Sequence, residues 1–167
     1  MYRNIVVPLD GSEIAEQVLP YVKDLIRGRT VKVHLISIAP LAVSVAAPAP
    51  VRMYPLVMSR ADLEMHAQER DRIEEELRNY LRGIAVDIPR NGITVHEEIR
   101  FGEPAEEIIA YAEDTEADLI AMCTHGRAGL ARWAYGSVAE KVMRHAPCPV
   151  LLVRARKPEP ATAEEAI

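Results

Sequence analysis

Short, almost uninterrupted apolar runs recur along the chain, and helical patterns separate them. Four of these runs are rich in valine, isoleucine and leucine, and they cover residues 4–10, 31–39, 117–124 and 149–154. Such runs are typical of parallel strands that helices cover on both faces. A fifth run, residues 93–101, alternates apolar and polar side chains, which favours an edge strand with one solvated face.

Amphipathic helical patterns fill the intervals, over residues 12–28, 62–83, 103–114 and 137–146. Pro20 lies inside the first pattern and should bend that helix near its middle. The second pattern has an apolar stripe at Leu63, Ala67, Ile73, Leu77 and Leu81. With right-handed crossovers, the alternation predicts a doubly wound three-layer α/β/α domain. We expect a Rossmann-like, five-stranded, mainly parallel sheet in the order 3-2-1-4-5.

The length of 167 residues suits one buried core, and we expect one nucleotide-binding domain over residues 1–155. Residues 40–61 show no clean pattern and predict a long flexible loop, whereas residues 156–167 are polar and predict a disordered tail. We find no signal peptide and no run that could span a bilayer, so we expect a cytoplasmic protein without a membrane partner. The formal net charge of −5 argues against a nucleic-acid partner.

Three of the 8 glycines lie close together after the fourth apolar run, at Gly126, Gly129 and Gly136. Glycine at positive φ lets consecutive N–H groups converge on an anion, and Ser137 opens the last helix, whose N-terminus attracts anions. Positive charge near this loop comes from Arg127, Arg132 and Lys141. Each residue alone fits an ordinary turn or helix cap, but the whole set favours a phosphate site.

A second group of candidates lies at the ends of two predicted strands. The first strand ends in Pro8, Leu9 and Asp10, and the fourth ends in Met122 and Cys123. Ligands of doubly wound sheets bind beyond such carboxyl ends, where the strand order reverses. Asp10 either accepts hydrogen bonds from a ribose or base, or serves as a turn residue before the helix.

Several enzyme classes are disfavoured by missing motifs. The chain has no Walker A sequence, no G-x-G-x-x-G after the first strand, and no receiver-type acidic set. His125 has neither a nucleophile nor an orienting carboxylate beside it in sequence. The two cysteines lack metal-ligand spacing. We therefore assign no catalytic residue and no protein metal site.

Taken together, the motifs resemble the universal stress protein family. The resemblance rests on the opening IVVPLDGSE, the SIA end of the second strand, and the G-x-P-A-x-x-I segment from Gly102 to Ile108. It also rests on nine residues between Gly126 and Gly136, followed by SVAEKVMRHAPCPVLLV. It covers about residues 1–154.

The resemblance implies an adenine-nucleotide-binding, stress-responsive regulatory homodimer rather than an enzyme. The implied ligand is ATP, ADP or AMP, often with Mg²⁺ or Mn²⁺. The residues carried over as its contacts are Pro8, Leu9, Asp10, Ile38, Met122, Cys123, Gly126, Arg127, Gly129, Gly136, Ser137 and Val138. The residues that would pair with a second copy are Val150, Leu151, Leu152 and Val153.

One position departs from the family pattern G-2x-G-9x-G-[ST]. Cys123 stands where the first glycine is expected, and its Cβ and thiol reduce the room for close approach. A second hypothesis is therefore a member that has lost the nucleotide and serves as a dimeric protein-interaction module. A slow ATPase is the third.

Overall fold

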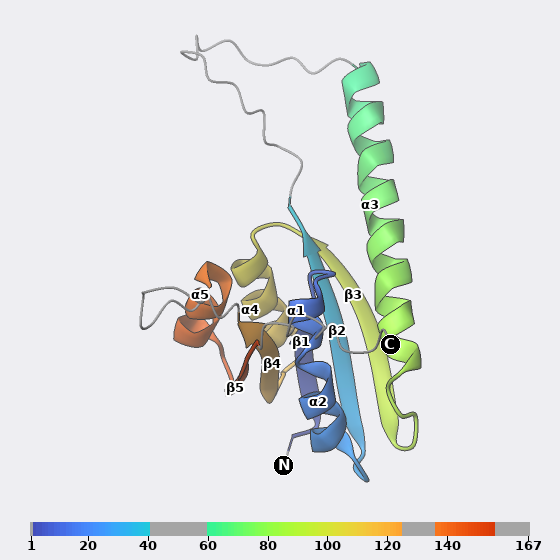
Figure 1. Cartoon of the computed structure of the whole chain (residues 1–167). Helices are drawn as coiled ribbons and strands as arrows, with labels where there is room; N and C mark the ends of the chain where they lie inside the picture. Colours follow the sequence, from blue (N-terminus) through green and yellow to red (C-terminus); the bar gives the residue numbers. More distant parts are fainter. Residues whose placement is uncertain (1, 41–59, 125–135, 156–167) are drawn as a thin grey trace, which may run out of the picture.

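The computed structural model describes residues 2–40, 60–124 and 136–155 (Figure 1). All neighbouring strands run parallel in one five-stranded sheet of order β3-β2-β1-β4-β5, so the predicted fold class and strand order are confirmed. The alternating segment is the predicted edge strand. The strands are β1 (Asn4–Pro8), β2 (Val31–Ala39), β3 (Ile93–Phe101), β4 (Leu119–Thr124) and β5 (Val150–Arg154).

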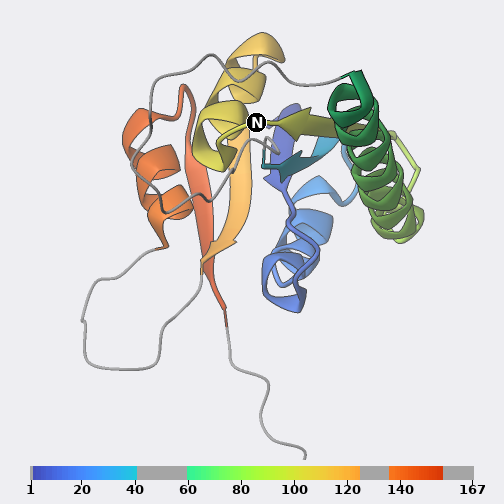
Figure 2. The same ribbon diagram turned by 90° about the horizontal axis from the view of Figure 1, so that it is seen from above.

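Helices cover both faces of this sheet, which gives the predicted three layers (Figures 1 and 2). One face carries α1 (Glu13–Glu16), α2 (Leu19–Ile26) and α3 (Arg60–Val86). The other carries α4 (Pro104–Asp114) and α5 (Ser137–His145). The strand order therefore reverses between β1 and β4, at the centre of the sheet.

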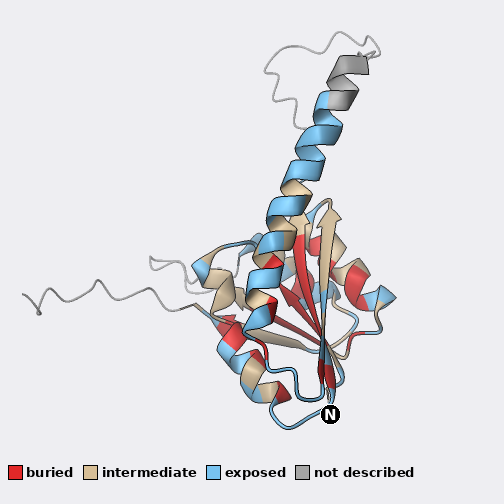
Figure 3. Ribbon diagram, turned by 90° about the vertical axis from the view of Figure 1, so that its right-hand side faces the viewer, coloured by how far each residue is buried: buried red, intermediate tan, exposed pale blue. Residues whose placement is uncertain are grey.

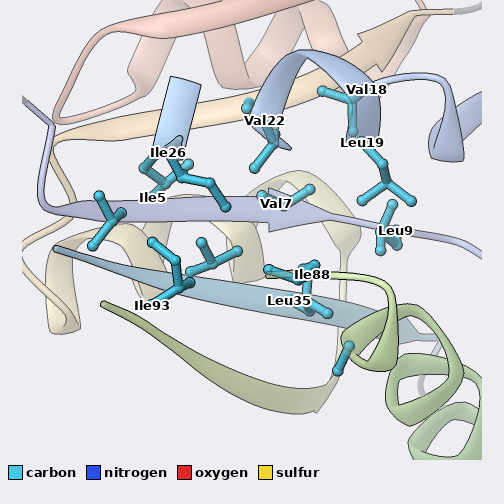
Figure 4. Close-up of a cluster of buried hydrophobic side chains, with 14 of the residues drawn as sticks. Ile5, Val7, Leu9, Val18, Leu19, Val22, Ile26, Leu35, Ile88 and Ile93 are labelled. Carbon is cyan, nitrogen blue, oxygen red and sulfur yellow. The ribbon is translucent and has the colours of Figure 1, made fainter. Parts of the chain in front are cut away.

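The side chains of central strand β1 alternate between two apolar clusters. Ile5, Val7 and, just after the strand, Leu9 lie in the cluster beneath α2 and α3, whereas Val6 lies in the cluster beneath α4 and α5. Figure 4 shows the first cluster, where β1 is covered by Val18, Leu19, Val22 and Ile26. Burial on both faces explains why β1 is apolar without alternation.

The prediction of one bent helix over residues 12–28 was wrong in form. The segment divides into α1, which ends at Glu16, and α2, which begins at Leu19. Pro20 lies in the first turn of α2, where a missing N–H costs no helical hydrogen bond. The proline therefore starts a second helix instead of bending the first.

Helix α3 is longer than the sheet that it covers. Its 27 residues extend for about 40 Å, whereas the nine residues of β3 extend for about 30 Å. Its first part therefore projects past the sheet (Figures 1 and 3), and residues 65–72 are exposed. The predicted apolar stripe is wrong at Ala67, which is exposed, and holds at Leu81, which is buried.

Two predicted features fall largely outside the described residues. The loop predicted for 40–61 overlaps the undescribed residues 41–59, and α3 already begins at Arg60. The predicted tail, residues 156–167, lies entirely outside.

Candidate functional site

A cavity of about 280 Å³ opens at the carboxyl ends of β1 and β4, where the strand order reverses. This is the position at which doubly wound sheets hold ligands. Its size is near the lower end of small-molecule sites, which span about 300–1,000 Å³. Its lining residues are Pro8, Leu9, Asp10, Ile14, Ala15, Ile38, Pro104, Ile108, Met122, Cys123, Thr124, Gly136, Ser137, Val138 and Ala139.

The cavity brings together most of the residues that the sequence singled out. Those that line it are Pro8, Leu9, Asp10, Ile38, Met122, Cys123, Gly136, Ser137 and Val138. The remaining three, Gly126, Arg127 and Gly129, lie outside the described residues, as do His125 and Arg132.

Sequence reasoning missed five lining residues, all of them in helices: Ile14, Ala15, Pro104, Ile108 and Ala139. Of these, Ala15 and Ile108 fit the apolar stripes of the predicted helices, which face the core. Ile108 is buried and belongs to the core as well as to the cavity wall. The only signal that could have found them is their distance of about one helical turn from a predicted strand end or helix start.

The β1–α1 connection is held by its own hydrogen bonds. Asp10 Oδ1 accepts from the Ser12 N–H at 3.0 Å and from the Ser12 hydroxyl at 2.6 Å. Ser12 Oγ in turn accepts from the Ala15 N–H at 3.1 Å and caps α1. Gly11, with φ of +80°, makes this tight turn possible. Asp10 is therefore a turn residue, and its Oδ2 has no partner among the described residues.

Ser37, the first residue of the SIA segment, fastens the end of β1 to β2. Its buried hydroxyl donates to the Leu9 carbonyl at 2.7 Å, while the Leu9 N–H donates to the Ile36 carbonyl at 2.9 Å. Both backbone polar groups of Leu9 are thereby occupied. The Asp10 turn consequently leaves the sheet from a fixed point.

Among the described residues, the start of α5 has no cap comparable to that of α1. Gly136 occupies the N-cap position with φ of −56° and ψ of 151°, and no described side chain caps the helix. The first backbone bond of α5 runs from the Glu140 N–H to the Gly136 carbonyl at 2.9 Å. The N–H groups of Ser137, Val138 and Ala139 precede this bond and belong to residues that line the cavity. A helix start of this kind attracts anions.

Lys141 does not supply the positive charge that the sequence suggested. Its Nζ lies 2.8 Å from Glu106 Oε1 and 3.4 Å from Glu103 Oε2, at the start of α4. The hydrogen bond to Glu106 is the main reason that the pKa of Lys141 is raised. Lys141 therefore links α5 to α4.

Cys123 and Met122 point to opposite sides of β4. The Cys123 side chain packs against the cluster beneath α2 and α3, and the Met122 side chain lies in the cluster beneath α4 and α5. Burial raises the pKa of the Cys123 thiol, so the thiol is protonated at neutral pH. It is accordingly a poor nucleophile.

Neither a metal cluster nor a membrane-spanning helix occurs within residues 2–40, 60–124 and 136–155. These ranges contain no group of three or more His, Cys, Asp or Glu residues that could hold a metal ion. Within the same ranges, every helix is too short or too polar to cross a membrane.

Comparisons with known proteins agree with this architecture. The chain is 31% identical over 159 residues to the universal stress protein MJ0531 of Methanocaldococcus jannaschii, covering 95% of this chain and 86% of that one. The solved structure of MJ0577 superposes with a TM-score of 0.72 at 28% identity, covering 95% of this chain and 99% of that one.

Two further solved structures share the fold and carry a nucleotide. One is a universal stress protein in complex with cAMP, at 19% identity and a TM-score of 0.56, covering 93% of this chain and 98% of that one. The other is a universal stress protein family protein of Arabidopsis thaliana with AMP bound. It is 18% identical with a TM-score of 0.57, covering 96% of this chain and 97% of that one. At such identities they show the fold alone. The model of the universal stress protein family matches residues 1–154, and the chain therefore belongs to that family.

Proposed function

We propose that this protein is a cytoplasmic, stress-responsive regulator that binds ATP, ADP or AMP in the cavity between β1 and β4 and acts as a homodimer. The observation that carries the proposal is the uncapped start of α5, which opens into a cavity at the switch point of the sheet. Two solved structures of similar fold, one in complex with cAMP and one with AMP bound, support an adenine nucleotide as the ligand.

The lining of the cavity suits the chemistry of each part of a nucleotide. Ile38, Pro104 and Ile108 offer apolar surface to a base. The N–H groups at the start of α5 suit phosphate oxygens, since they bring free donors and the positive end of the helix dipole. The Oδ2 of Asp10, which has no partner among the described residues, suits a ribose hydroxyl.

The residues that line the cavity favour binding over catalysis. Asp10 and Cys123 are the titratable residues among those that line the described cavity, and the thiol is protonated. Neither is placed with a second group that would activate water. We expect Mg²⁺ or Mn²⁺ to be held mainly by the phosphates of the nucleotide, because Mg²⁺ is commonly bound by one or two carboxylates together with substrate phosphates.

Gly136 offers a clean test of the phosphate end. A Cβ at this position meets no atom within 4 Å, and its negative φ suits any residue. Gly136→Asp places a carboxylate at the start of α5, and Gly136→Asn adds the same shape without charge. Both residues are good N-caps, so both variants should fold.

We expect the Asp variant to bind Mg-ATP at least about 100-fold more weakly than wild type, because unit charges 4 Å apart repel by about 4 kcal/mol at an effective dielectric constant of about 20. The Asn variant should stay within about tenfold of wild type, since it only competes for one N–H group. Isothermal titration calorimetry with ATP, ADP, AMP and GTP measures both. Equal ATP affinity in the two variants would place the phosphates elsewhere.

The departure at Cys123 keeps the nucleotide-free interaction module as a second candidate. If the protein is such a module, folded wild-type protein should bind no adenine nucleotide. However, the Cys123 side chain packs against the core cluster, on the face of the sheet opposite to α5. Nucleotide released from denatured, freshly purified protein would rule this candidate out.

The homodimer in this proposal would use the free edge of β5. The Ala155 N–H donates to the Thr124 carbonyl at 3.1 Å, and the Ile120 N–H donates to the Pro149 carbonyl at 3.0 Å. Odd-numbered residues of β5 therefore bond toward β4. Because bonding direction alternates along a strand, the N–H of Leu152 points away from β4, toward the open edge of the sheet. There it can pair with a strand of a second copy.

Leu152→Pro removes this outward donor and leaves the β4–β5 ladder in place, whereas Leu152→Ala keeps the donor and shortens the side chain. Proline is tolerated at edge strands for this reason. Light scattering should find a dimer for wild type and Leu152→Ala, and a monomer for Leu152→Pro. Three identical dimers would exclude β5 pairing.

A further inference from the structure

We propose that Tyr80 of α3 is a positioning residue for the cavity: its hydroxyl holds α1, a wall of the cavity, through Glu16. The assignment rests on the proposed nucleotide site for its functional consequence. The bond itself, from Tyr80 Oη to Glu16 Oε1, measures 3.0 Å and joins residues 64 positions apart in sequence. Neither residue lines the cavity.

Helix α1 needs support from outside itself. It has four residues, Glu13–Glu16, and none of them is buried. An isolated helix this short does not persist in water. Yet Ile14 and Ala15 form part of the cavity lining, so the position of α1 sets the shape of that wall.

Among the described residues, a side-chain hydrogen bond holds each end of α1, and the partly buried Ala15 packs against the core cluster between them. At the start, Ser12 Oγ accepts from the Ala15 N–H. At the end, Glu16 accepts from Tyr80, whose ring packs against the buried cluster that contains Leu81 and Ala85 of the same helix. The anchor is therefore fixed to the core by its ring and offers its hydroxyl to α1.

Tyr80 also lies within the electrostatic field of the Asp10 turn. Burial is the main reason that the pKa of its hydroxyl is raised, and the neighbouring Glu16 and Asp10 carboxylates raise it further, while the Gly11 backbone opposes them. The hydroxyl is thus a neutral donor at physiological pH. It stands beside both the turn that carries Asp10 and the helix that carries Ile14.

Tyr80→Phe tests this role because it removes the hydroxyl and keeps the ring. Tyr111→Phe is the matched control, since the Tyr111 hydroxyl contacts His34 Nδ1 at 3.0 Å on the opposite face of the sheet. Amide exchange of residues 15–18, followed by nuclear magnetic resonance in the free protein, reports on α1 directly. Calorimetric titration with Mg-ATP reports on the cavity.

We expect Tyr80→Phe to speed exchange of residues 15–18 by about tenfold and to weaken ATP binding by about tenfold, as for a hydrogen bond to a charged acceptor. Tyr111→Phe should change neither. Glu16→Gln, which keeps an acceptor oxygen without its charge, should fall between wild type and Tyr80→Phe in both measurements. Glu16→Ala should match Tyr80→Phe, and the double variant should add nothing further.

Unchanged exchange in Tyr80→Phe would overturn the anchor, and this outcome is independent of nucleotide because exchange is measured in the free protein. Faster exchange with unchanged ATP affinity would overturn the positioning role and leave Tyr80 a structural contact. Failure of wild type to bind any nucleotide would instead refute the proposed function, while the exchange measurement still decides whether Tyr80 holds α1.

Discussion

The two helix starts that line the cavity differ in how their polar groups are bonded within the described part of the chain. In the β1–α1 connection, Asp10, Ser12 and the Ala15 N–H bond to one another, and Tyr80 holds the far end of α1. On the β4–α5 side, α5 begins at Gly136 without a cap from any described side chain. The first helix start is already bonded, and the second offers N–H donors that no described side chain occupies.

This difference indicates which side of the cavity contributes most to the binding free energy of each part of a ligand. A preformed wall supplies shape and one free carboxylate oxygen, so it discriminates between nucleosides more than it attracts charge. Free N–H groups at a helix start gain most from a charged acceptor. The β4–α5 side should therefore dominate affinity, and the β1–α1 side should dominate selectivity.

Removing phosphates from the ligand should give the largest effect. Two charge-assisted hydrogen bonds contribute about 3 kcal/mol or more, which corresponds to at least about 100-fold in affinity. We expect adenosine to bind wild type at least that much more weakly than ATP by calorimetric titration. Adenosine should also bind wild type and Gly136→Asp equally. An adenosine affinity close to that of ATP would reverse the roles of the two connections.

Changing Asp10 should give an intermediate effect. Asp10→Asn keeps the oxygen that accepts from Ser12 and removes the charge, so we expect about tenfold weaker binding of ATP with unfolding free energy changed by less than about 1 kcal/mol. Asp10→Ala also breaks the turn and should cost about 1–2 kcal/mol of stability in urea denaturation.

Ser12→Ala is the control for the Asp10 variants, because it removes the cap and spares the carboxylate. It should lower stability by about 1 kcal/mol, as loss of an N-cap does, and affect binding less than Asp10→Asn. If Asp10→Asn binds ATP as tightly as wild type, the carboxylate serves the turn alone.

The sequence predicted the fold well because local patterns carry it. Runs such as residues 5–9 are apolar throughout, which is typical of a strand covered on both faces. The order of strands and helices then leaves few topologies. The projecting part of α3 was missed because Ala67 continues a helical stripe, and nothing local shows where the sheet beneath it ends.

The site was predicted in part, for a comparable reason. Asp10 and Gly136 stand at strand and helix ends that a sequence pattern reveals. Tyr80 reaches α1 from helix α3, 64 residues away in sequence, and Ser37 reaches the end of β1 from the neighbouring strand β2. Lys141 was misjudged because its partner, Glu106, belongs to a helix that only the folded sheet brings near.

The smallest effect is expected at Cys123, where the family pattern has glycine. Its side chain packs against the cluster beneath α2 and α3. The thiol therefore lies on the face of the sheet that carries α1, opposite to the face that carries α5. Cys123→Ala removes the thiol and keeps the Cβ. We expect ATP affinity within about threefold of wild type, since no polar bond is lost, and a stability loss of about 1 kcal/mol from the small cavity that remains.

Cys123→Gly separates the Cβ from the thiol in the same titration. If the Cβ restricted the approach of phosphate, this variant would bind ATP much more tightly than Cys123→Ala. We expect the two to agree within about threefold, because the Cβ points toward the core cluster and away from the start of α5. A large gain for glycine alone would mean that the bonded β1–α1 side also limits how closely the phosphates approach, and the division between the two connections would then be wrong at this residue.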